Sequence, residues 1–482
     1  MPEFIIIGAG PAGLTTAWEL VKRGHRPIVL EKYHMVGGIA RTEQYKGYRF
    51  DIGGHRFFTK VQEVNDLWHT WMGTEFLSRP RQSRIFYDGR YFHYPLRAFN
   101  ALSNMGLWRS LGIVLSYLKF KLFPYPREDN FEQWVTNRFG KRLYEIFFKT
   151  YTEKVWGIPC TEIRAEWAAQ RIKGLSLPAA IVNALFKPKG EVLKTLIERF
   201  EYPMHGPGMM WEYAARAVQA KGGEVRLNCD VLRVTREGTR VTGVVVSNAG
   251  KETRLAAHHV ISSMPLSELI CQLDPPAPPE VQDAAVQLSY RDFLTVVLIF
   301  HQPDLFADNW IYIHSPEVKV GRIQNFKNWS PHMVPDPDMS SLGLEYFCTE
   351  NDDLWRMSDA DLIALGRREI EQIGLARAAD VVDGVVVRQL KAYPVYDAAY
   401  AGHLETIKSF LAEFKNLQTV GRNGLHKYNN QDHSMLTAIL AVRNLNGEHH
   451  DLWQVNTERS YHEEVRLPHK KVEEKPVDIL EA

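Results

Sequence analysis

The residues with the clearest chemical meaning stand near the start of the chain. A short apolar run leads into Gly8-Ala9-Gly10-Pro11-Ala12-Gly13, and Glu31 closes the next apolar run. In such a motif Gly8 allows a tight turn, Gly10 lets backbone approach a pyrophosphate, and Gly13 lets a helix pack on a strand. The helix N-terminus offers N–H groups to the phosphates, and Glu31 accepts from a ribose hydroxyl. The pattern predicts a dinucleotide-binding β-α-β unit.

Two further glycine-rich turns follow this unit. They read Val36-Gly37-Gly38-Ile39-Ala40-Arg41-Thr42 and Asp51-Ile52-Gly53-Gly54-His55-Arg56-Phe57-Phe58-Thr59. Both resemble segments that contact the pyrophosphate and the flavin in FAD enzymes of the amine-oxidase and glutathione-reductase superfamily, and nicotinamide dehydrogenases lack such elements. Adjacent glycines let backbone lie against a flat ring. We therefore expect FAD as the cofactor, with contacts by Gly38, Arg41, Gly53, Gly54 and His55.

Length and composition set broad limits. A chain of 482 residues, 45% of them hydrophobic, is globular and long enough for about three domains. Lysine and arginine total 58 against 57 acidic residues, and the net charge of +1 gives no global attraction to nucleic acid or to an anionic membrane. Any anion site must therefore be local. The four cysteines are Cys160, Cys229, Cys271 and Cys348. Their spacing indicates neither a metal site nor a disulfide framework, which fits a reducing cytoplasm.

Targeting and membrane segments are not expected. The N-terminal apolar run continues directly into the glycine turn instead of a cleavage site, so we expect no signal peptide. The nearest candidate for a transmembrane span, Ser110 to Phe123, is too short and is interrupted by Lys119 and Lys121. With Trp108 this segment could lie on a membrane surface, although an amphipathic helix packed within the protein is more common.

The order of apolar patterns predicts an α/β fold of the glutathione-reductase and amine-oxidase type. We expect a Rossmann-like FAD-binding domain, an inserted helical domain and an antiparallel β substrate domain. The expected bounds are 1–85, 196–285 and 415–450 for the FAD-binding domain, 86–195 for the helical insertion, 286–414 for the substrate domain, and 451–482 for a charged C-terminal tail. Val231 stands where FAD folds commonly meet the adenine.

Segments far apart in the sequence together resemble UDP-galactopyranose mutases, flavoenzymes that interconvert the pyranose and furanose forms of a nucleotide sugar. Tyr151-Thr152-Glu153-Lys154-Val155-Trp156-Gly157 is similar to the family's Y-T-x-K-x-W-G segment. Gly321-Arg322-Ile323-Gln324-Asn325-Phe326-Lys327-Asn328-Trp329, with Glu345-Tyr346, is similar to its R-I-x-x-x-K and E-Y strands. Ala392-Tyr393-Pro394-Val395 and Gly421-Arg422-Asn423-Gly424-Leu425-His426-Lys427-Tyr428 resemble its Y-P-V and G-R-x-G-x-x-x-Y elements.

This resemblance implies roles for the matching residues. Arg171 stands near the place of a family arginine, with the spacing shifted by one residue, and Tyr202 is a further candidate for contacting phosphate. Substrate contacts are implied for Tyr151, Trp156, Arg171, Tyr202, Arg322, Tyr393 and Tyr428, cofactor contacts for Gly421, Arg422 and Asp432, and catalytic roles for Arg322, Tyr428, Arg171 and His55.

The implied reaction uses the flavin as a nucleophile. In this family N5 of reduced flavin attacks the anomeric carbon and displaces UDP, so the reduced form of FAD is required and no net redox change occurs. Arginine forks and phenolic donors suit a diphosphate. A plainer interpretation stays open, in which Arg322 and Arg422 are structural ion-pair partners and Tyr151 and Trp156 pack in the core. We expect a nucleotide-sugar substrate, NAD(P)H or a flavin as a possible reductant and a possible homodimer, but no metal.

Two residues depart from the mutase pattern. Phe58 stands where the family's G-H-x-x-H turn has its second histidine, and Asn430 stands where the family has an acidic residue, with Asp432 shortly after. Both changes lie next to the expected chemistry. They leave the expected fold unchanged and are also compatible with a different sugar nucleotide or with true oxidation.

The main alternative is a flavin oxidoreductase of the protoporphyrinogen oxidase, phytoene desaturase or amine oxidase type. These enzymes share the FAD scaffold and pass a hydride from an apolar substrate to flavin N5. Phe58 makes the expected flavin wall more apolar, and Met209, Met210 and Trp211 could line a channel. Arg322 and Tyr428, however, would have no purpose for such a substrate. A third class is a flavin-binding protein without turnover.

Overall fold

A parallel sheet forms one half of the molecule. The computed structural model describes residues 3–94, 100, 104–165, 195–196, 199–456 and 464–465. Within them the five strands of this sheet run in the order β10, β2, β1, β14, β21 and are all parallel. Their bounds are Glu224–Arg226, Ile28–Leu30, Phe4–Ile7, His259–Ser262 and Leu417–Thr419.

Both faces of this sheet are covered, as the uninterrupted apolar strands β1 and β2 require. Side chains alternate along β1, so Ile6 packs with the helical layer while Ile5 and Ile7 pack on the opposite face. The helical layer consists of α1 (Pro11–Val21), α2 (Gln62–Met72), α10 (Pro207–Ala220) and α18 (Gln431–Leu445). The opposite layer consists of α11 (Leu266–Cys271), α12 (Pro279–Val286), α16 (Tyr400–Leu411) and a small four-stranded sheet. This is the Rossmann-like arrangement that the sequence predicts.

The four-stranded sheet is built around a hairpin. Its order is β13, β12, β11, β15, and β11 pairs antiparallel with β12 but parallel with β15. The bounds are Lys251–Ala256, Arg240–Asn248, Cys229–Glu237 and Leu273–Asp274. The backbone N–H of Cys229 donates to the carbonyl of Glu31 (2.8 Å), which fixes the start of β11 beside the end of β2.

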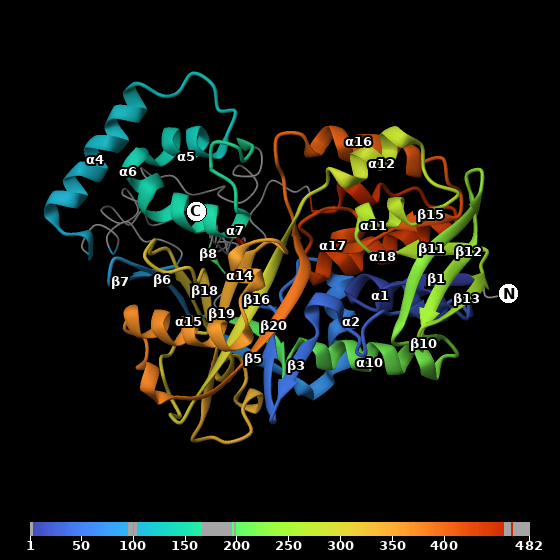
Figure 1. Cartoon of the computed structure of the whole chain (residues 1–482), viewed down its shortest axis with the longest axis horizontal. Helices are drawn as coiled ribbons and strands as arrows, with labels where there is room; N and C mark the ends of the chain where they lie inside the picture. Colours follow the sequence, from blue (N-terminus) through green and yellow to red (C-terminus); the bar gives the residue numbers. More distant parts are fainter. Residues whose placement is uncertain are drawn as a thin grey trace, which may run out of the picture.

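A seven-stranded sheet forms the other half (Figure 1). Its order is β20, β16, β19, β18, β17, β6, β7, with bounds Val381–Pro394, Tyr290–Phe300, Ser340–Cys348, Arg322–Asn325, Trp310–Ile313, Ser83–Tyr87 and Arg90–His93. Its pairs are antiparallel except β17 with β6, which is parallel. The antiparallel sheet expected for 286–414 is therefore extended by a hairpin from far earlier in the chain.

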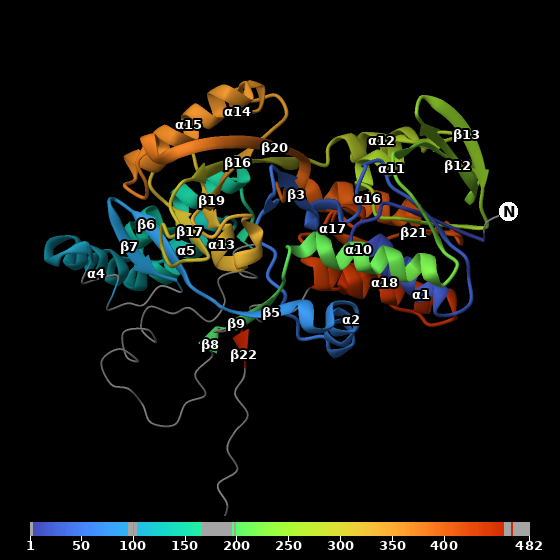
Figure 2. The same ribbon diagram turned by 90° about the horizontal axis from the view of Figure 1, so that it is seen from below.

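Helices cover both faces of the larger sheet. On one face α15 (Asp359–Gln372) packs across β16 and β20 (Figure 2). On the other face Ile85 and Phe92 pack against a helical group. That group comprises α4 (Leu107–Leu122), α5 (Phe131–Phe139), α6 (Lys141–Tyr144), a π-helical turn (Glu145–Lys149) and α7 (Thr150–Trp156).

The remaining elements connect the two halves. Short two-stranded sheets pair β3 with β4, β5 with β9, and β8 with β22, with bounds Thr42–Tyr45, Tyr48–Asp51, Phe76–Pro80, Arg199–Pro203, Thr195–Leu196 and Glu464–Val465. Short helices are α13 (Phe326–Trp329), α14 (Asp353–Arg356) and α17 (Gly421–Gly424). No helix among the described residues is both long and apolar enough to span a membrane.

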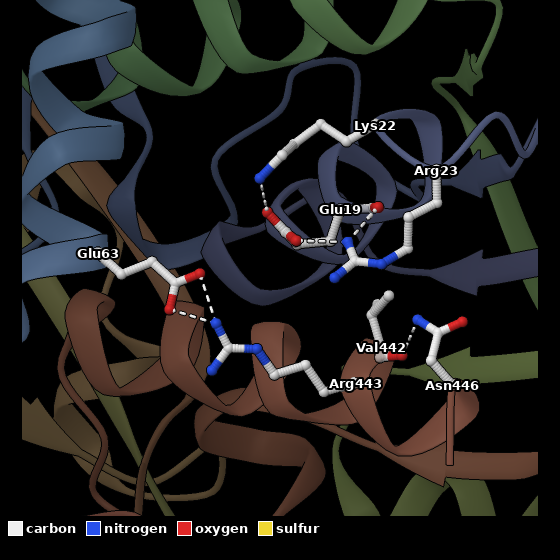
Figure 3. A network of polar contacts seen from close by, with 7 residues as sticks. All are labelled: Glu19, Lys22, Arg23, Glu63, Val442, Arg443 and Asn446. Atoms are coloured by element: carbon white, nitrogen blue, oxygen red, sulfur yellow. Dashed lines mark hydrogen bonds and ion pairs between the residues drawn. The ribbon is translucent and has the colours of Figure 1, made fainter. Parts of the chain in front are cut away.

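Polar contacts fix the helical layer of the parallel sheet (Figure 3). Arg443 of α18 donates to both carboxylate oxygens of Glu63 of α2 at 2.8 and 2.7 Å. Glu19 of α1 is buried and accepts from Lys22 (2.8 Å) and Arg23 (2.6 Å). Burial works to raise the pKa of Glu19, but these two cations outweigh it and hold the pKa below its ordinary value. The Arg443–Glu63 pair thus joins α18 to α2, whereas Glu19 stabilises the C-terminal end of its own helix, α1.

Candidate functional site

The first glycine motif forms a backbone cradle where β1 ends. Gly8 has φ +94°, and a Cβ there would lie 2.3 Å from Ser263 Oγ. A Cβ on Gly13 would lie 1.8 Å from the carbonyl oxygen of Gly8, so only glycine lets α1 pack this closely. Gly10 is the N-cap of α1 and faces the backbone of Gly38 from the second turn. The cradle thus exposes backbone at a helix N-terminus, where phosphates bind.

Glu31 and Arg41 are held rigidly beside this cradle. The carboxylate of Glu31 accepts from the backbone N–H of Ala9 (2.7 Å) and of Tyr33 (2.9 Å). It retains lone pairs that can accept from hydroxyls. Arg41 is buried and donates to Glu43, to the carbonyl of Gly38 (2.9 Å) and to Gln389 (2.7 Å). Val231 is buried in β11, two residues beyond the strand start that bonds to Glu31.

A cavity opens where the second and third glycine turns meet α17 and the N-terminus of α18. Its volume is about 720 Å³, including the open mouth. Its walls bring together many of the residues that the sequence predicts for the site: Gly53, Gly54, His55, Arg322, Tyr393, Arg422, Tyr428 and Asp432. Ile39, Ile52, Arg56, Phe58, Trp68, Asn430 and Gln431 complete them.

The side chain of Gln431 shows what this cavity can hold. Both of its amide atoms are buried, and neither has a hydrogen-bond partner within the described part of the chain. A buried amide without partners is costly, so it calls for a ligand with donors and acceptors of its own. The polar edge of a flavin ring meets that need, and Gly53 and Gly54 offer a flat backbone beside it. The residues present therefore fit FAD.

Two arginines reach this cavity from different halves of the molecule. Arg322 extends from β18 and Arg422 from α17. Between them the rings of Tyr393 and Tyr428 are stacked, with centroids 5.5 Å apart and planes 12° apart. The Arg422 guanidinium lies 5.5 Å from the ring centroid of Tyr393 and 5.0 Å from that of Tyr428. The arrangement forms one cationic and phenolic wall.

A carboxylate behind Arg322 sets its orientation. Arg322 Nε donates to Glu345, which is fully buried on β19 and also accepts from Gln324 (2.8 Å). Burial opposes the charge of Arg322, but Glu345 and the neighbouring tyrosines together outweigh that effect and hold the arginine pKa above its ordinary value. The expected structural ion pair therefore exists, yet Arg322 also lines the cavity.

Arg422 is positioned by backbone carbonyls instead of a carboxylate. Its Nε donates to the carbonyl of Asn429 (2.8 Å) and its Nη1 to that of Ala392 (3.1 Å). Arg56 is a third cation in the wall and lies 4.9 Å from the Trp310 ring centroid. Three arginines thus line the cavity with one carboxylate, Asp432. The cavity wall therefore carries a local excess of positive charge in a chain whose net charge is +1.

His55 is uncharged at neutral pH. Burial, together with the charges of Arg422, Arg322 and Arg41, lowers its pKa to about 3. Its Nδ1 lies 3.1 Å from the carbonyl of Gly53, which fixes the ring in the third glycine turn. A neutral imidazole adds no charge to the cavity and can still donate or accept a hydrogen bond.

Two aromatic residues of α7, Tyr151 and Trp156, contact other aromatic side chains near the cavity. Tyr151 stacks on His314, with centroids 4.8 Å apart, and meets Tyr312 edge-on at 5.4 Å. Burial raises the pKa of Tyr151, and the nearby charge of Arg322 opposes this rise. Trp156 lies 6.4 Å from Tyr428, centroid to centroid. Trp156 belongs to a buried core cluster with Tyr428 on its edge, and neither Tyr151 nor Trp156 is among the residues that line the cavity.

Other predicted residues lie elsewhere. Tyr202 is fully buried, and its hydroxyl donates to Asp51 at 2.6 Å, outside the residues that line the cavity. Arg171 lies outside the described residues. The sequence predicts no role for Asp51 or Glu345, whose partners are far away in the sequence, nor for Gln431, whose burial in the cavity wall leaves no local pattern.

The two departures from the mutase pattern both line the cavity. Phe58 contributes an apolar ring. Asn430 is the N-cap of α18: its side chain accepts from the backbone of His433, and its own N–H donates to His433 Nδ1 (3.2 Å). Asparagine is among the preferred N-cap residues, so Asn430 stabilises the start of α18.

A Rossmann-like sheet, three glycine turns and a cavity suited to a flavin define an FAD-binding flavoprotein. The chain belongs to the flavin containing amine oxidoreductase family, whose model matches residues 11–426. FAD is accordingly its cofactor.

Similar proteins within this fold differ in function. A Mycobacterium tuberculosis (strain ATCC 25618 / H37Rv) protein assigned as flavin-containing monoamine oxidase AofH is 24% identical over 59% of this chain and 61% of that protein. Prolycopene isomerase of Daucus carota is 24% identical over 54% of this chain and 46% of that protein. The chain thus spans about three fifths or less of the length of these relatives.

Solved structures extend the likeness to nearly the whole chain. The structure of reduced UDP-galactopyranose mutase superposes with a TM-score of 0.82, covers 96% of this chain and 100% of that chain, and is 20% identical. A protein from Exiguobacterium sp. 255-15 assigned as protoporphyrinogen oxidase gives a TM-score of 0.68, covers 92% and 99%, and is 18% identical. Because the sequence identities are only 20% and 18%, these superpositions show that the fold is shared and nothing more about function.

Proposed function

We propose that this protein is an FAD-dependent mutase that interconverts the pyranose and furanose forms of a UDP-sugar. The observation that carries the proposal is the convergence of Arg322 and Arg422 on one cavity, across the stacked rings of Tyr393 and Tyr428. These side chains come from separate elements of both halves of the molecule. A diphosphate needs such planar cationic forks and phenolic donors.

The charges of the cavity favour an anionic substrate. Arg56, Arg322 and Arg422 outnumber Asp432 in the wall, and His55 is neutral. An apolar substrate would offer no acceptor to the guanidinium groups that face the cavity. A nucleotide diphosphate would neutralise them.

The protein's own part in the reaction is to hold and stabilise the leaving group. FAD, when bound in its reduced form, supplies the nucleophile for the anomeric carbon. Arg322 and Arg422 would bind the UDP oxygens and stabilise the negative charge that develops as the anomeric C–O bond breaks. Tyr428 would donate to the same diphosphate, and Tyr151 and Trp156 would orient the uridine and sugar. The bond to UDP re-forms at the end, so no electrons are gained or lost.

A second candidate function is hydride transfer from an apolar substrate to the flavin. The observation that favours it is the apolar part of the cavity wall, where Phe58 and Trp68 stand with Ile39 and Ile52. The sequence relatives with oxidase names support the same reading. This candidate assigns no task to the arginine pair.

Binding of UDP to the oxidised holoenzyme tests the proposal, since a ligand beside the flavin alters its absorbance. We expect UDP to shift the spectrum and uridine to do so far less. Arg322→Ala should weaken UDP binding at least about tenfold, because a charge-assisted bidentate contact is lost. Arg377→Ala is the matched control, since Arg377 is exposed and pairs with Asp380 on the surface.

Two outcomes would refute the proposal. One is a UDP response that Arg322→Ala leaves unchanged. The other is no UDP response together with flavin reduction by an apolar substrate, which would favour the redox candidate.

A further inference from the structure

Helix α4 presents an apolar face to solvent. Among the described residues ten large hydrophobic side chains are exposed, and six of them lie between residues 108 and 123. Trp108 is 81% exposed, Leu122 73% and Phe123 74%. Leu111, Leu115 and Leu118 complete the set. Scattered exposed hydrophobics need no explanation, but a cluster on one element marks an interaction surface.

The spacing of these residues forms a single stripe. At about 100° per residue, positions 108, 111, 115, 118 and 122 fall within an arc of about 80°. The opposite side of α4 is the one that packs on the protein, where Ile113 is buried. There Gly140 approaches so closely that its Cβ would lie 2.7 Å from the backbone N of Tyr117. The helix is therefore anchored with its apolar stripe outward.

Basic residues flank this stripe. Between residues 104 and 127 the chain carries Arg109, Lys119, Lys121 and Arg127 and no aspartate or glutamate. On the helical projection Lys119 and Lys121 fall on opposite sides of the stripe, and both are exposed. Arg109 pairs with Asp88 of the neighbouring hairpin. Because Arg109 is paired and Glu128 and Asp129 directly follow Arg127, Lys119 and Lys121 carry the positive charge beside the stripe.

We propose that α4 docks the protein on an anionic lipid surface, lying in the plane of the headgroups. The leucines of the stripe and Trp108 would enter the acyl boundary, while Lys119 and Lys121 reach out to lipid phosphates. The 16 residues of α4 measure about 24 Å and include lysines, so the helix lies on the surface instead of crossing it. Figure 1 shows α4 at one end of the long axis of the molecule.

Charge favours lipid over a second copy of this chain. Two copies joined through their stripes would bring Lys119 and Lys121 of both helices together, and α4 itself has no carboxylate to pair with them. Facing like charges cost free energy at an interface. Anionic phosphates instead complement both the lysines and the amphipathic Trp108.

Sedimentation of the full-length holoenzyme with vesicles tests this surface. We expect binding to vesicles of phosphatidylcholine with 30% phosphatidylglycerol, about the anionic content that makes basic residues attractive, and little binding to phosphatidylcholine alone. Leu115→Gln with Leu118→Gln should reduce binding at least about tenfold, because both apolar side chains are lost from the stripe. Lys119→Glu with Lys121→Glu should reduce it by a similar factor and remove its salt sensitivity.

Val286→Gln with Val382→Gln is the matched control, because both valines are exposed far from α4. This variant should bind like the wild type, and flavin absorbance confirms the folding of each variant. Three results would overturn the proposal: no binding of the wild type to anionic vesicles, unchanged binding of the Leu115 and Leu118 variant, or a wild-type dimer that this variant converts to monomers. None of them bears on UDP binding, so this proposal and the mutase proposal fail separately.

Discussion

Arg322 on β18 donates through Nε to Glu345, its direct partner on the neighbouring strand β19. Glu345 is fully buried, whereas the side chain of Arg322 is 17% exposed and lines the cavity. The ion pair therefore anchors the guanidinium from behind and leaves it available to a ligand in front. Arg322 can therefore be both an ion-pair partner and a ligand-binding residue, because its Nε bonds to Glu345 while the rest of the guanidinium faces the cavity.

Breaking this pair from behind should destabilise the fold. Glu345→Ala leaves the Arg322 charge without its buried partner, and we expect the free energy of unfolding to fall by about 3 kcal/mol. Urea unfolding of the holoenzyme measures it. Asp380→Ala, which removes a surface partner of Arg377, should have a much smaller effect. Equal losses in both variants would contradict the anchoring role.

The glycine cradle predicts a selective loss of cofactor. In Gly13→Ala the new Cβ would collide with the carbonyl of Gly8, so α1 must move away from the phosphate position. We expect the purified variant to contain little flavin, as measured by the ratio of absorbance at the flavin and protein maxima. Gly402→Ala in α16 has open space around the new Cβ and should retain full flavin content. Retention of flavin by Gly13→Ala would exclude the cradle as the cofactor site.

A variant of Tyr202 distinguishes a structural role of this residue from a role in substrate binding. Its hydroxyl donates to the buried Asp51, so Tyr202→Phe should lower the free energy of unfolding by about 1–3 kcal/mol through an unsatisfied carboxyl group. UDP affinity should stay unchanged, because the hydroxyl does not face the cavity. A tenfold loss of UDP affinity with unchanged stability would instead support the phosphate contact that the sequence resemblance implies.

Buried histidines make the protein sensitive to mild acid. Burial lowers the pKa of His426 to about 4, against an ordinary value of 6.5 in the unfolded chain. Between these values the unfolded chain binds a proton that the folded protein does not, so stability is present above pH 6.5 and falls as the pH decreases. At pH 5 the protonation of this residue in the unfolded chain should lower the free energy of unfolding by about 2 kcal/mol.

Replacement of His426 by Gln checks this assignment. The difference in unfolding free energy between pH 7 and pH 5 should shrink by up to about 2 kcal/mol in His426→Gln. It should stay the same in His34→Gln, since His34 is exposed. Identical pH dependence of both variants and the wild type would rule out His426 as a contributor.

Local signals made much of the fold predictable. The turn at Gly8 to Gly13 and the position of Glu31 depend on neighbours within one β-α-β unit, so the sequence alone shows the parallel sheet and its cradle. The pairing of β6 with β17 joins residues more than 200 positions apart and leaves no local pattern. The antiparallel prediction for that sheet was incomplete for this reason.

The residues of the site also fall into those that motifs predict and those that only the structure reveals. Arg322, Arg422, Tyr393 and Tyr428 were named from motifs, and the structure brings them to one wall. The contact of Tyr202 with Asp51 arises from packing between β9 and the end of β4, which no spacing in the sequence reveals. Asn430 is the N-cap of α18, a role that becomes visible only with the helix boundary.

The most direct test of the proposed function is product formation by the reduced enzyme. The holoenzyme is reduced without oxygen and incubated with UDP-galactopyranose and other UDP-sugars, and the nucleotide sugars are separated by chromatography. We predict a furanose product from at least one UDP-sugar with wild type and with Arg377→Ala, and a rate at least about a hundredfold lower with Arg322→Ala, since each lost transition-state contact costs this order. Absence of furanose product from every UDP-sugar with fully reduced enzyme that binds UDP would contradict the mutase account.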